Sequence, residues 1–442
     1  MLGEAGSPLS VVVPLPPSYR GGTEEYAYRL AEWYARTVPV HIFTTTVRWD
    51  ADAPQIEFGA AELERLPARE VLERPLLLSV PSRRRLFRDV RGSSGMQLHM
   101  PFPFVEAPAV RAARAEGIPT VLTYHMDADL GGARRVPGAA AVTAAYRALS
   151  AFPALDACDV VVSNSRGYAE ASPVLSRFLR KVRVIHKGVD PARLGLRGPR
   201  RRERYLPAGL APDDVPPGRS RLVFLGRLVP YKGVPVLLEA TRRLLDRGED
   251  VILLIGGRGP QEPELRALAA QLGIEARVRF LGFVPDRDVG ALYRFADAVV
   301  VPSVSTLESS ATALEEAAMC GTPVVGTDLP GAGETVPHDG RRGVLVPPGD
   351  PDALAAGIGK VLDAGRPAQP TPLRTWDAAA EEYAALFDEL GAAHLGSRRP
   401  GRLGRLLDRP RAPSLDRPLG SSWLSTVLRG TGSSRYRRSR TQ

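Results

Sequence analysis

The stretch LVFLGRLVPYKG, residues 222–233, predicts a strand and a glycine-containing loop, the unit with which an α/β domain begins in the second half of the chain. Its first four residues are apolar and predict a buried strand, and the apolar spacing after it predicts a helix over Val234–Asp246. Glycines between the two leave the backbone open to a close-lying phosphate, and Arg227 and Lys232 place two positive charges at the end of the strand. The pattern therefore favours an anion site on an α/β unit. The alternative is a surface turn with two solvated cations.

Strands and helices continue to alternate toward the C-terminus. We expect strands at Val251–Gly256, Val278–Leu281, Ala298–Pro302, Pro323–Gly326 and Gly343–Val346, and helices at Gln261–Leu272, Asp286–Phe295, Ser309–Cys320 and Pro351–Ala364. Strands that alternate with helices predict a parallel sheet covered on both faces. Residues 221–375 are therefore expected to form one doubly wound domain.

The N-terminal half shows the same alternation. We expect strands at Leu9–Pro14, Val40–Thr45, Pro119–Tyr124, Val160–Ser163 and Val182–His186, and a helix at Thr23–Arg36. The fold class predicted for the chain is α/β, with two Rossmann-like domains facing a central cleft, the first over residues 1–195. Residues 196–220, rich in Arg, Pro, Gly and Asp, are expected to be a linker, and Trp376–Leu390 one more amphipathic helix.

The positive charge of the chain is concentrated at its C-terminal end. The 442 residues carry a net charge of +10, and residues 397–442 contain twelve Arg against two Asp, which equals that excess. The remainder is formally neutral, so the charge does not indicate a nucleic-acid-binding fold. We expect residues 391–442, rich in Arg, Pro, Ser and Gly, to be a disordered basic tail.

Two cysteines, Cys158 and Cys320, cannot form a disulfide framework and are expected to be buried apolar residues. The N-terminus shows no secretory signal, and no window approaches the length of a membrane-spanning helix. These features predict a cytoplasmic protein, with the inner face of the membrane as a further surface on which it can dock.

Two glutamates follow the strand expected at Ala298–Pro302. Glu308 lies at a loop–helix junction, and Glu316 comes about two helical turns later. The first amides of this helix suit an anion, and carboxylates accept hydrogen bonds from sugar or ribose hydroxyls. The alternatives are a helix cap for Glu308 and a solvated face for Glu316, although Ala317, Ala318 and Cys320 indicate that Glu316 is buried.

Three weaker signals lie in the first half. Gly21-Gly22 follows the first strand and resembles half of a phosphate-binding loop. His125 ends the strand Pro119–Tyr124, a position more often structural than catalytic. Asp127 and Asp129 imitate a metal-binding pair of aspartates, but their context favours a loop without a metal.

Taken in order, these motifs resemble the retaining glycosyltransferases of the GT-B fold, known as group 1 or family four. The resemblance covers about residues 9 to 390. It includes, besides the segments above, Ser163-Asn164-Ser165, Gly188-Val189-Asp190, Gly256-Gly257, Gly282-Phe283-Val284 and Gly321-Thr322-Pro323-Val324-Val325. This chain departs from the family at Ser310 and Ala311, where an aromatic and a glycine are frequent, and at Lys187, where asparagine is frequent.

The resemblance implies a role for each matching position. Arg227 and Lys232 would bind the donor diphosphate, Glu308 the hydroxyls of the donor sugar, and Glu316 the nucleotide ribose. His125 would contact the transferred sugar. The remaining donor contacts would come from Gly21, Gly22, Val284, Ser310, Ala311 and Thr312.

The same resemblance implies no cofactor and no metal, and a nucleotide-sugar donor such as a UDP- or GDP-linked sugar. Residues 1–195 would bind the acceptor, residues 221–375 the donor, and the helix 376–390 would return to the first domain. The acceptor is a glycan, a lipid or a small molecule.

Two other functions remain open from the sequence. One is a different two-domain nucleotide-sugar enzyme, such as a UDP-GlcNAc 2-epimerase. The other is a binding protein whose basic tail engages an anionic membrane or, less favoured, nucleic acid. For the tail we expect reversible docking to an anionic membrane through its arginines and the apolar stretch Trp423–Leu428.

Overall fold

The computed structural model describes residues 7–19, 21–47, 55–71, 74–76, 79–128, 137–196, 215–216, 218–306, 308, 311–331, 333–334, 337–366 and 371–397. Contacts divide the chain into two compact units. Unit 1 comprises Met1–Thr123, Ala148–Val160 and Ala380–Gln442, and unit 2 comprises Tyr124–Arg147 and Val161–Ala379. The tail expected over residues 391–442 lies outside the described residues from residue 398 onward, as does most of the linker expected over 196–220.

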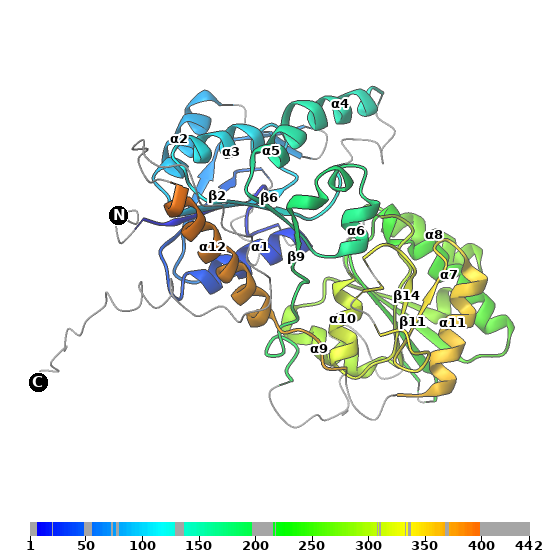
Figure 1. The fold of residues 1–442 in the computed structure, drawn as a ribbon. Helices are drawn as coiled ribbons and strands as arrows, with labels where there is room; N and C mark the ends of the chain where they lie inside the picture. The colour runs from blue at the N-terminus through cyan, green and yellow to red at the C-terminus, as the bar shows by residue number, and fades with distance from the viewer. Residues whose placement is uncertain are drawn as a thin grey trace, which may run out of the picture. The chain divides into compact units, whose positions relative to one another are not determined.

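The first sheet has seven strands in the order β3-β2-β1-β6-β7-β8-β9. The strands are β1 (Leu9–Val12), β2 (Val40–Thr45), β3 (Glu62–Leu66), β6 (Gly95–Met100), β7 (Thr120–Tyr124), β8 (Val160–Ser163) and β9 (Val182–Val184). The helices of this part of the chain are α1 (Gly22–Tyr34), α2 (Val80–Arg91), α3 (Glu106–Ala115), α4 (Ala139–Tyr146), α5 (Phe152–Ala157) and α6 (Arg166–Ala171). A separate ribbon pairs β4 (Arg69–Val71) with β5 (Arg74–Leu76). Figure 1 shows α2, α3 and α5 on one face of the sheet and α1 on the other.

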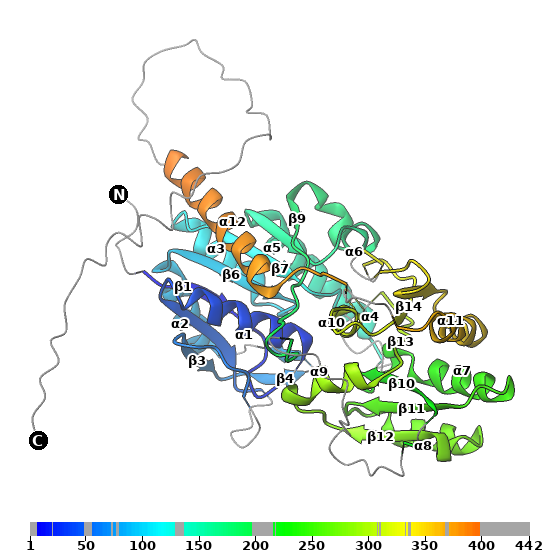
Figure 2. The same cartoon turned by 90° about the horizontal axis from the view of Figure 1, so that it is seen from below.

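The second sheet has six strands in the order β12-β11-β10-β13-β14-β15, and all its pairs are parallel. Its strands are β10 (Ser220–Leu225), β11 (Val251–Gly256), β12 (Val278–Gly282), β13 (Ala298–Val301), β14 (Val324–Thr327) and β15 (Gly343–Val346). Its helices are α7 (Val234–Asp246), α8 (Glu262–Gln271), α9 (Asp286–Phe295), α10 (Thr312–Met319) and α11 (Pro351–Ala364). Figure 2 shows the labels of β10, β11 and β12 in their order across the sheet.

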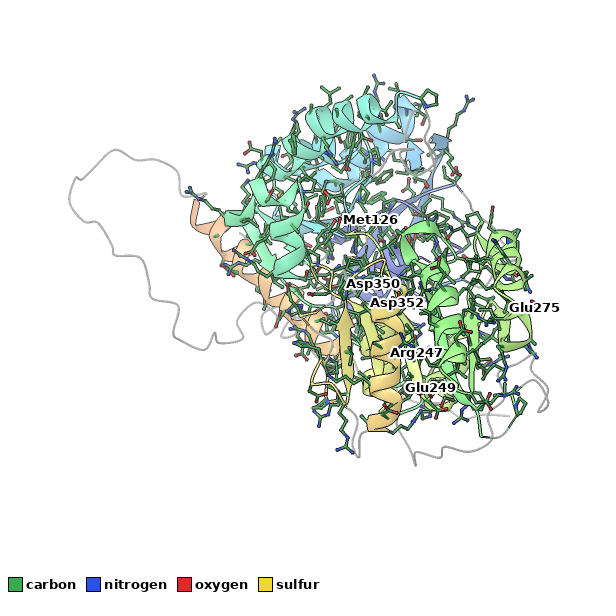
Figure 3. All side chains as sticks on the ribbon, turned by 90° about the vertical axis from the view of Figure 1, so that its right-hand side faces the viewer. Met126, Arg247, Glu249, Glu275, Asp350 and Asp352 are labelled. Carbon is green, nitrogen blue, oxygen red and sulfur yellow. The ribbon has the colours of Figure 1, made fainter. Side chains whose placement is uncertain are left out.

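Alternating side chains of the second sheet build two separate cores. Leu222, Phe224 and Val300 pack under α7, α8 and α11, while Val223 and Val299 pack under α9 and α10. Because both faces of a parallel sheet are covered, its strands are apolar runs rather than alternating ones, which is why they could be predicted. Helix α11 begins where Asp350 accepts hydrogen bonds from the backbone N–H groups of Asp352, at 2.9 Å, and Ala353, at 3.0 Å (Figure 3).

Two predicted helix ends are corrected by the structure. Helix α10 begins at Thr312 rather than Ser309, because Ala311 has a non-helical backbone with ψ 57°. Helix α12 (Trp376–Ser397) continues beyond Leu390. The added turns are tied to unit 1, since the Nδ1 of His394 is 2.9 Å from the carbonyl of Gly117 and its Nε2 is 3.2 Å from Asp159.

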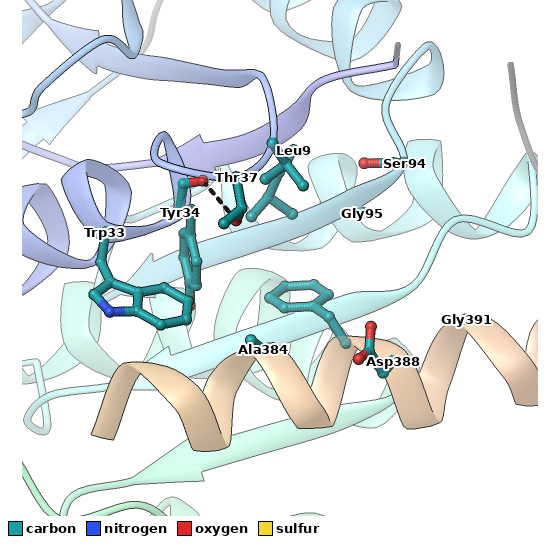
Figure 4. Close-up of a pocket in the computed structure, with 11 residues that line it drawn as sticks. Leu9, Trp33, Tyr34, Thr37, Ser94, Gly95, Ala384, Asp388 and Gly391 are labelled. Atoms are coloured by element: carbon teal, nitrogen blue, oxygen red, sulfur yellow. Dashed lines mark hydrogen bonds between the residues drawn. The ribbon is translucent and has the colours of Figure 1, made fainter. Parts of the chain in front are cut away.

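The face of α12 that packs against α1 is aromatic. Tyr383 and Phe387 lie edge-on to Tyr26 and Tyr34 of α1, with ring centroids 6.2 and 6.4 Å apart. A pocket opens beside this contact, and its lining includes Leu9, Trp33 and, from α12, Phe387 and Asp388. Figure 4 shows Leu9, Trp33 and Asp388 at this pocket. Within the described ranges, no helix is long and apolar enough to cross a membrane.

Candidate functional site

The second sheet reverses its strand order between β10 and β13. In doubly wound sheets, ligands bind outside the carboxyl ends of the strands at such a point. The loop after β10 carries Arg227 and Lys232, and the loop after β13 carries Glu308. The strand order thus brings together two loops whose residues Lys232 and Glu308 are 76 positions apart in the sequence.

Direct backbone contact joins these two loops. Pro230–Lys232 forms one 3₁₀ turn that ends at Gly233, whose φ is +67°. A Cβ at Gly233 would lie 2.0 Å from the carbonyl oxygen of Pro302, so only glycine permits this approach. The N–H of Val304 donates to the carbonyl of Tyr231 at 2.8 Å. These contacts fix the position of Lys232 against the loop that holds Glu308.

Lys232 and Glu308 form an ion pair, and both side chains are largely buried. The hydroxyl of Ser303 donates to the same carboxylate oxygen of Glu308 at 2.8 Å. The carbonyl of Ser303 in turn accepts from Thr327 at 2.6 Å. Burial of Glu308 is therefore compensated by a cation and a hydroxyl, which identifies it as more than a helix cap.

The electrostatic balance of Lys232 keeps its ammonium charged. Burial lowers the pKa of Lys232, but the charge of Glu308 and the hydroxyl of Tyr231 raise it by more, so this pKa lies above its ordinary value. Arg227, which is exposed, acts in the opposite direction because its charge repels that of Lys232. Two cations thus share one edge of the sheet, a suitable setting for a diphosphate.

Glu316 lies on the buried side of α10 and is 6% exposed. Its Oε1 accepts from Arg193 Nη1 at 2.6 Å, and its Oε2 accepts from the hydroxyl of Tyr293 at 3.0 Å. Burial, followed by the charge of Glu316, raises the pKa of Tyr293 well above its ordinary value, so this phenol stays protonated as a donor. The structure therefore supplies partners for a glutamate whose burial would otherwise be costly.

The start of α10 offers backbone amides to a ligand. Ala311 occupies the cap position, and no side chain among the described residues caps the first turn. The positive end of the helix dipole lies at Ala311 and Thr312, next to the carboxyl end of β13. Ser310 lies outside the described residues, and Val284 follows β12 with its side chain half-buried.

The remaining predicted residues belong to the first sheet. Gly21 precedes α1 and Gly22 begins it, and a Cβ built on Gly22 would meet no atom within 4 Å among the described residues, apart from its chain neighbours and the backbone of α1. His125 follows β7 and is buried. Gly22 belongs to unit 1 and His125 to unit 2.

Asp127 is bound by hydroxyl groups. Its carboxylate accepts from Tyr124 at 2.9 Å, from Tyr168 at 3.1 Å and from Ser172 at 2.9 Å. Burial, followed by the charge of Asp127, raises the pKa of both phenols above the ordinary value. These contacts indicate that Asp127 joins its turn to the segment that contains Tyr168 and Ser172. Asp129, the second member of the predicted pair, lies outside the described residues.

Three residues around the glutamates escaped the sequence analysis. Ser303 had a detectable signal, because it follows β13 at the same edge as Glu308. Tyr293 and Arg193 had none, since they reach Glu316 from 23 and 123 residues away. A long-range contact between two polar residues leaves no trace in local patterns.

Known families match both halves of the chain. The model described as glycosyl transferases group 1 matches residues 212–375, and the model of glycosyltransferase family 4 matches residues 20–193. D-rhamnosyltransferase WbpZ of Pseudomonas aeruginosa is 30% identical over 76% of this chain and 81% of its own length. A D-inositol 3-phosphate glycosyltransferase of Salinispora tropica is 33% identical over 63% of this chain and 60% of its own length.

Solved structures share the architecture at lower identity. Sucrose-phosphate synthase from Thermosynechococcus elongatus is 21% identical with a TM-score of 0.60, covering 88% of this chain and 100% of that one. Anabaena Alr3699/HepE in complex with UDP and glucose is 17% identical with a TM-score of 0.57, covering 88% of this chain and 99% of that one. These likenesses confirm the predicted fold class, two Rossmann-like domains of the GT-B type.

Proposed function

Because this chain belongs to the group 1 and family 4 glycosyltransferases, we propose that it transfers a sugar from a nucleoside-diphosphate sugar to an acceptor hydroxyl with retention of configuration. Residues 221–375 bind the donor in this proposal, and residues 1–195 bind the acceptor. The observation that carries it is the Lys232–Glu308 ion pair at the point where the strand order of the second sheet reverses.

The chemistry follows from the groups at that edge. The bond between the anomeric carbon and the diphosphate oxygen breaks, and its electron pair stays on the diphosphate. Lys232 and Arg227, with the amides at the start of α10, stabilise this growing negative charge. The acceptor oxygen bonds to the anomeric carbon, and its proton passes to an oxygen of the departing diphosphate. Cationic side chains supply the compensation, so the proposal needs no metal ion.

The carboxylates orient the two halves of the donor. Glu308 accepts hydrogen bonds from hydroxyls of the transferred sugar, and Glu316 accepts them from the ribose. Val284 meets the base through its backbone, and the amides of Ser310, Ala311 and Thr312 lie against sugar and phosphate. Support for these roles comes from the order in which these residues follow the carboxyl ends of β12 and β13.

Two further residues complete the proposed site from the first sheet. Gly22, after Gly21, brings its amide to the diphosphate, and His125 contacts the transferred sugar near the reacting carbon. The open space over Gly22 supports the first role, and the position of His125 directly after β7 supports the second.

A thermal-shift panel of nucleotide sugars tests the proposal. A ligand that binds the native state raises the melting temperature in proportion to ln(1 + [L]/Kd), and we expect UDP- or GDP-linked sugars to do so. With an acceptor added, the bound donor should release nucleoside diphosphate, and the NMR coupling of the product should show the donor's anomeric configuration. Conversion of the donor without an acceptor would indicate an epimerase instead.

For residues 398–442 we propose reversible docking to an anionic membrane. Basic residues near such a leaflet contribute roughly 1 kcal/mol each, and one patch around Trp423 adds modestly. The full chain should co-sediment with anionic vesicles at low salt but not at high salt, and a chain ending at Ser397 should not. Equal sedimentation of the two chains would exclude the tail as the anchor.

A further inference from the structure

The segment Gly188-Val189-Asp190 is attached to the backbone that leads into α12. A Cβ at Gly188 would lie 2.2 Å from the carbonyl oxygen of Thr375. On either side, the N–H of Val189 donates to the carbonyl of Arg374, and the N–H of Trp376 donates to the carbonyl of Val189, both at 3.0 Å. Glycine is therefore required at 188, and the path of the following residues is fixed.

Asp190 shapes the turn that comes next. Its Oδ1 accepts from the backbone N–H groups of Ala192, at 2.8 Å, and Arg193, at 3.3 Å. Beyond the turn, the carbonyl of Leu194 accepts from Arg294 Nη1 at 2.7 Å and packs against Gly290, where a Cβ would lie 2.2 Å away. The backbone of Arg193 is thus held from both sides against α9.

The guanidinium of Arg193 joins two helices. Nη1 donates to Glu316 of α10 at 2.6 Å, and Nη2 donates to Asp286 at the start of α9 at 3.0 Å. A guanidinium is planar and presents its N–H groups in a rigid fork, so two fixed acceptors define its orientation. The Glu316 side chain it meets is 8% exposed, where a charge-assisted hydrogen bond is strong.

We propose that Arg193 is a positioning residue that holds the carboxylate of Glu316 in the geometry that accepts the ribose hydroxyls of the donor. This inference rests on the ribose role proposed for Glu316. Arg193 donates to Oε1 and Tyr293 donates to Oε2, so both oxygens of the carboxylate are held in fixed directions. The Gly188-Val189-Asp190 motif then has a function, because it delivers Arg193 to this point.

The test compares ribose with dideoxyribose. Calorimetry measures Kd for UDP, GDP and their 2′,3′-dideoxy analogues in wild type, Arg193→Met and Glu316→Gln. Arg221→Met is the matched control, because the Arg221 side chain is about as exposed as that of Arg193 and forms an ion pair with Asp297 at 2.8 Å, at the amino end of β10. The ratio of dideoxy to ribo Kd reports recognition of the hydroxyls and is insensitive to a general loss of stability.

We expect wild type to prefer the ribo form by about tenfold or more, on the scale of hydrogen bonds to a charged group. Arg193→Met and Glu316→Gln should each reduce that ratio to about twofold or less, while Arg221→Met keeps it. If Glu316→Gln loses the preference and Arg193→Met retains it, the positioning role is wrong and the ribose role of Glu316 stands. If wild type shows no preference, or binds neither diphosphate, the proposed function of the site fails first.

Discussion

The acidic residues at the carboxyl ends of the strands have different partners in the two sheets. At the edge formed by β10 and β13, Glu308 is paired with Lys232, and nearby Glu316 with Arg193. At the end of β7, Asp127 is surrounded by the hydroxyls of Tyr124, Tyr168 and Ser172. All three acids are partly or wholly buried and hydrogen-bonded, so burial alone does not separate them.

The difference lies in the partner. Where a carboxylate is paired with a cation, the cation can also bind a diphosphate. A ligand can therefore bind at such a cluster without leaving a charge unpaired. The Asp127 carboxylate accepts hydrogen bonds from Tyr124 in its own turn and from the distant Tyr168 and Ser172, so it holds these segments together. From this comparison we propose that the first edge binds the ligand and that Asp127 contributes to stability.

Removal of Lys232 should have the largest effect. Lys232→Ala is expected to lower donor turnover by about 100-fold or more, because one preorganised charge that stabilises the leaving diphosphate is lost. Steady-state kinetics of the purified variant measure this, and circular dichroism checks that it is folded. Turnover at the wild-type level would contradict the proposal that the edge formed by β10 and β13 binds the diphosphate.

The two glutamates should differ from each other. Glu316→Gln should weaken binding of free nucleoside diphosphate about tenfold, because Glu316 is the residue proposed to accept hydrogen bonds from the ribose. Glu308→Gln should mainly remove the added affinity that the sugar contributes, at a similar scale. Calorimetry with the diphosphate and with the full donor separates the two roles. Equal losses for both ligands in both variants would contradict them.

Asp127→Asn should affect stability rather than chemistry. An amide replaces one acceptor oxygen by a donor, so at least one hydroxyl loses its partner and the free energy of unfolding should fall by about 2 kcal/mol. Urea denaturation measures this loss, and donor turnover should change far less than in Lys232→Ala.

Turnover should also persist in EDTA. Inactivation by the chelator that a divalent ion reverses would make Asp127 and Asp129 candidate ligands.

The smallest effect is expected at Asp388, whose Oδ1 is buried beside the pocket of Figure 4 with no hydrogen-bond partner among the described residues. Burial raises the pKa of Asp388 to about 6. The folded state therefore binds this proton before the unfolded state does, and stability is gained as the pH falls from about 6 toward 4.

Asp388→Asn removes the cost of the buried charge. It should stabilise the protein by about 1 kcal/mol at pH 8, a value reduced because the side chain is partly exposed, and the gain should shrink below pH 6. Melting temperatures of both proteins at pH 8 and 4.5 measure it. A gain that grows toward low pH would contradict the assignment.

The sequence predicted the second sheet better than the first. Apolar runs such as Val251–Gly256 were assigned to the residue, because a strand buried on both faces leaves a continuous signal. Edge strand β3 has the sequence ELERL, with two exposed, two half-buried and one buried residue. It therefore contains no apolar run by which it could be predicted. Helix α2 carries five arginines over Val80–Arg91 and only a narrow apolar stripe at Leu86 and Val90.

At the site, local order in the chain predicted Lys232, Arg227 and Glu308, because each follows the end of an apolar strand. The other contacts at these residues could be found only from the three-dimensional structure. Neither the Arg193–Glu316 pair nor the enclosure of Asp127 by Tyr168 and Ser172 follows from spacing, since each joins segments that only the fold brings together.

Amide hydrogen exchange with and without a nucleoside diphosphate tests whether the diphosphate binds at the edge formed by β10 and β13. The full chain is labelled in the presence of saturating UDP or GDP, whichever stabilises it, and protection is mapped by peptide. We expect ligand-dependent protection in residues 226–233 and 302–319, and unchanged exchange in residues 124–128. Protection at the Asp127 turn without protection after β10 and β13 would show that the diphosphate binds at the other edge.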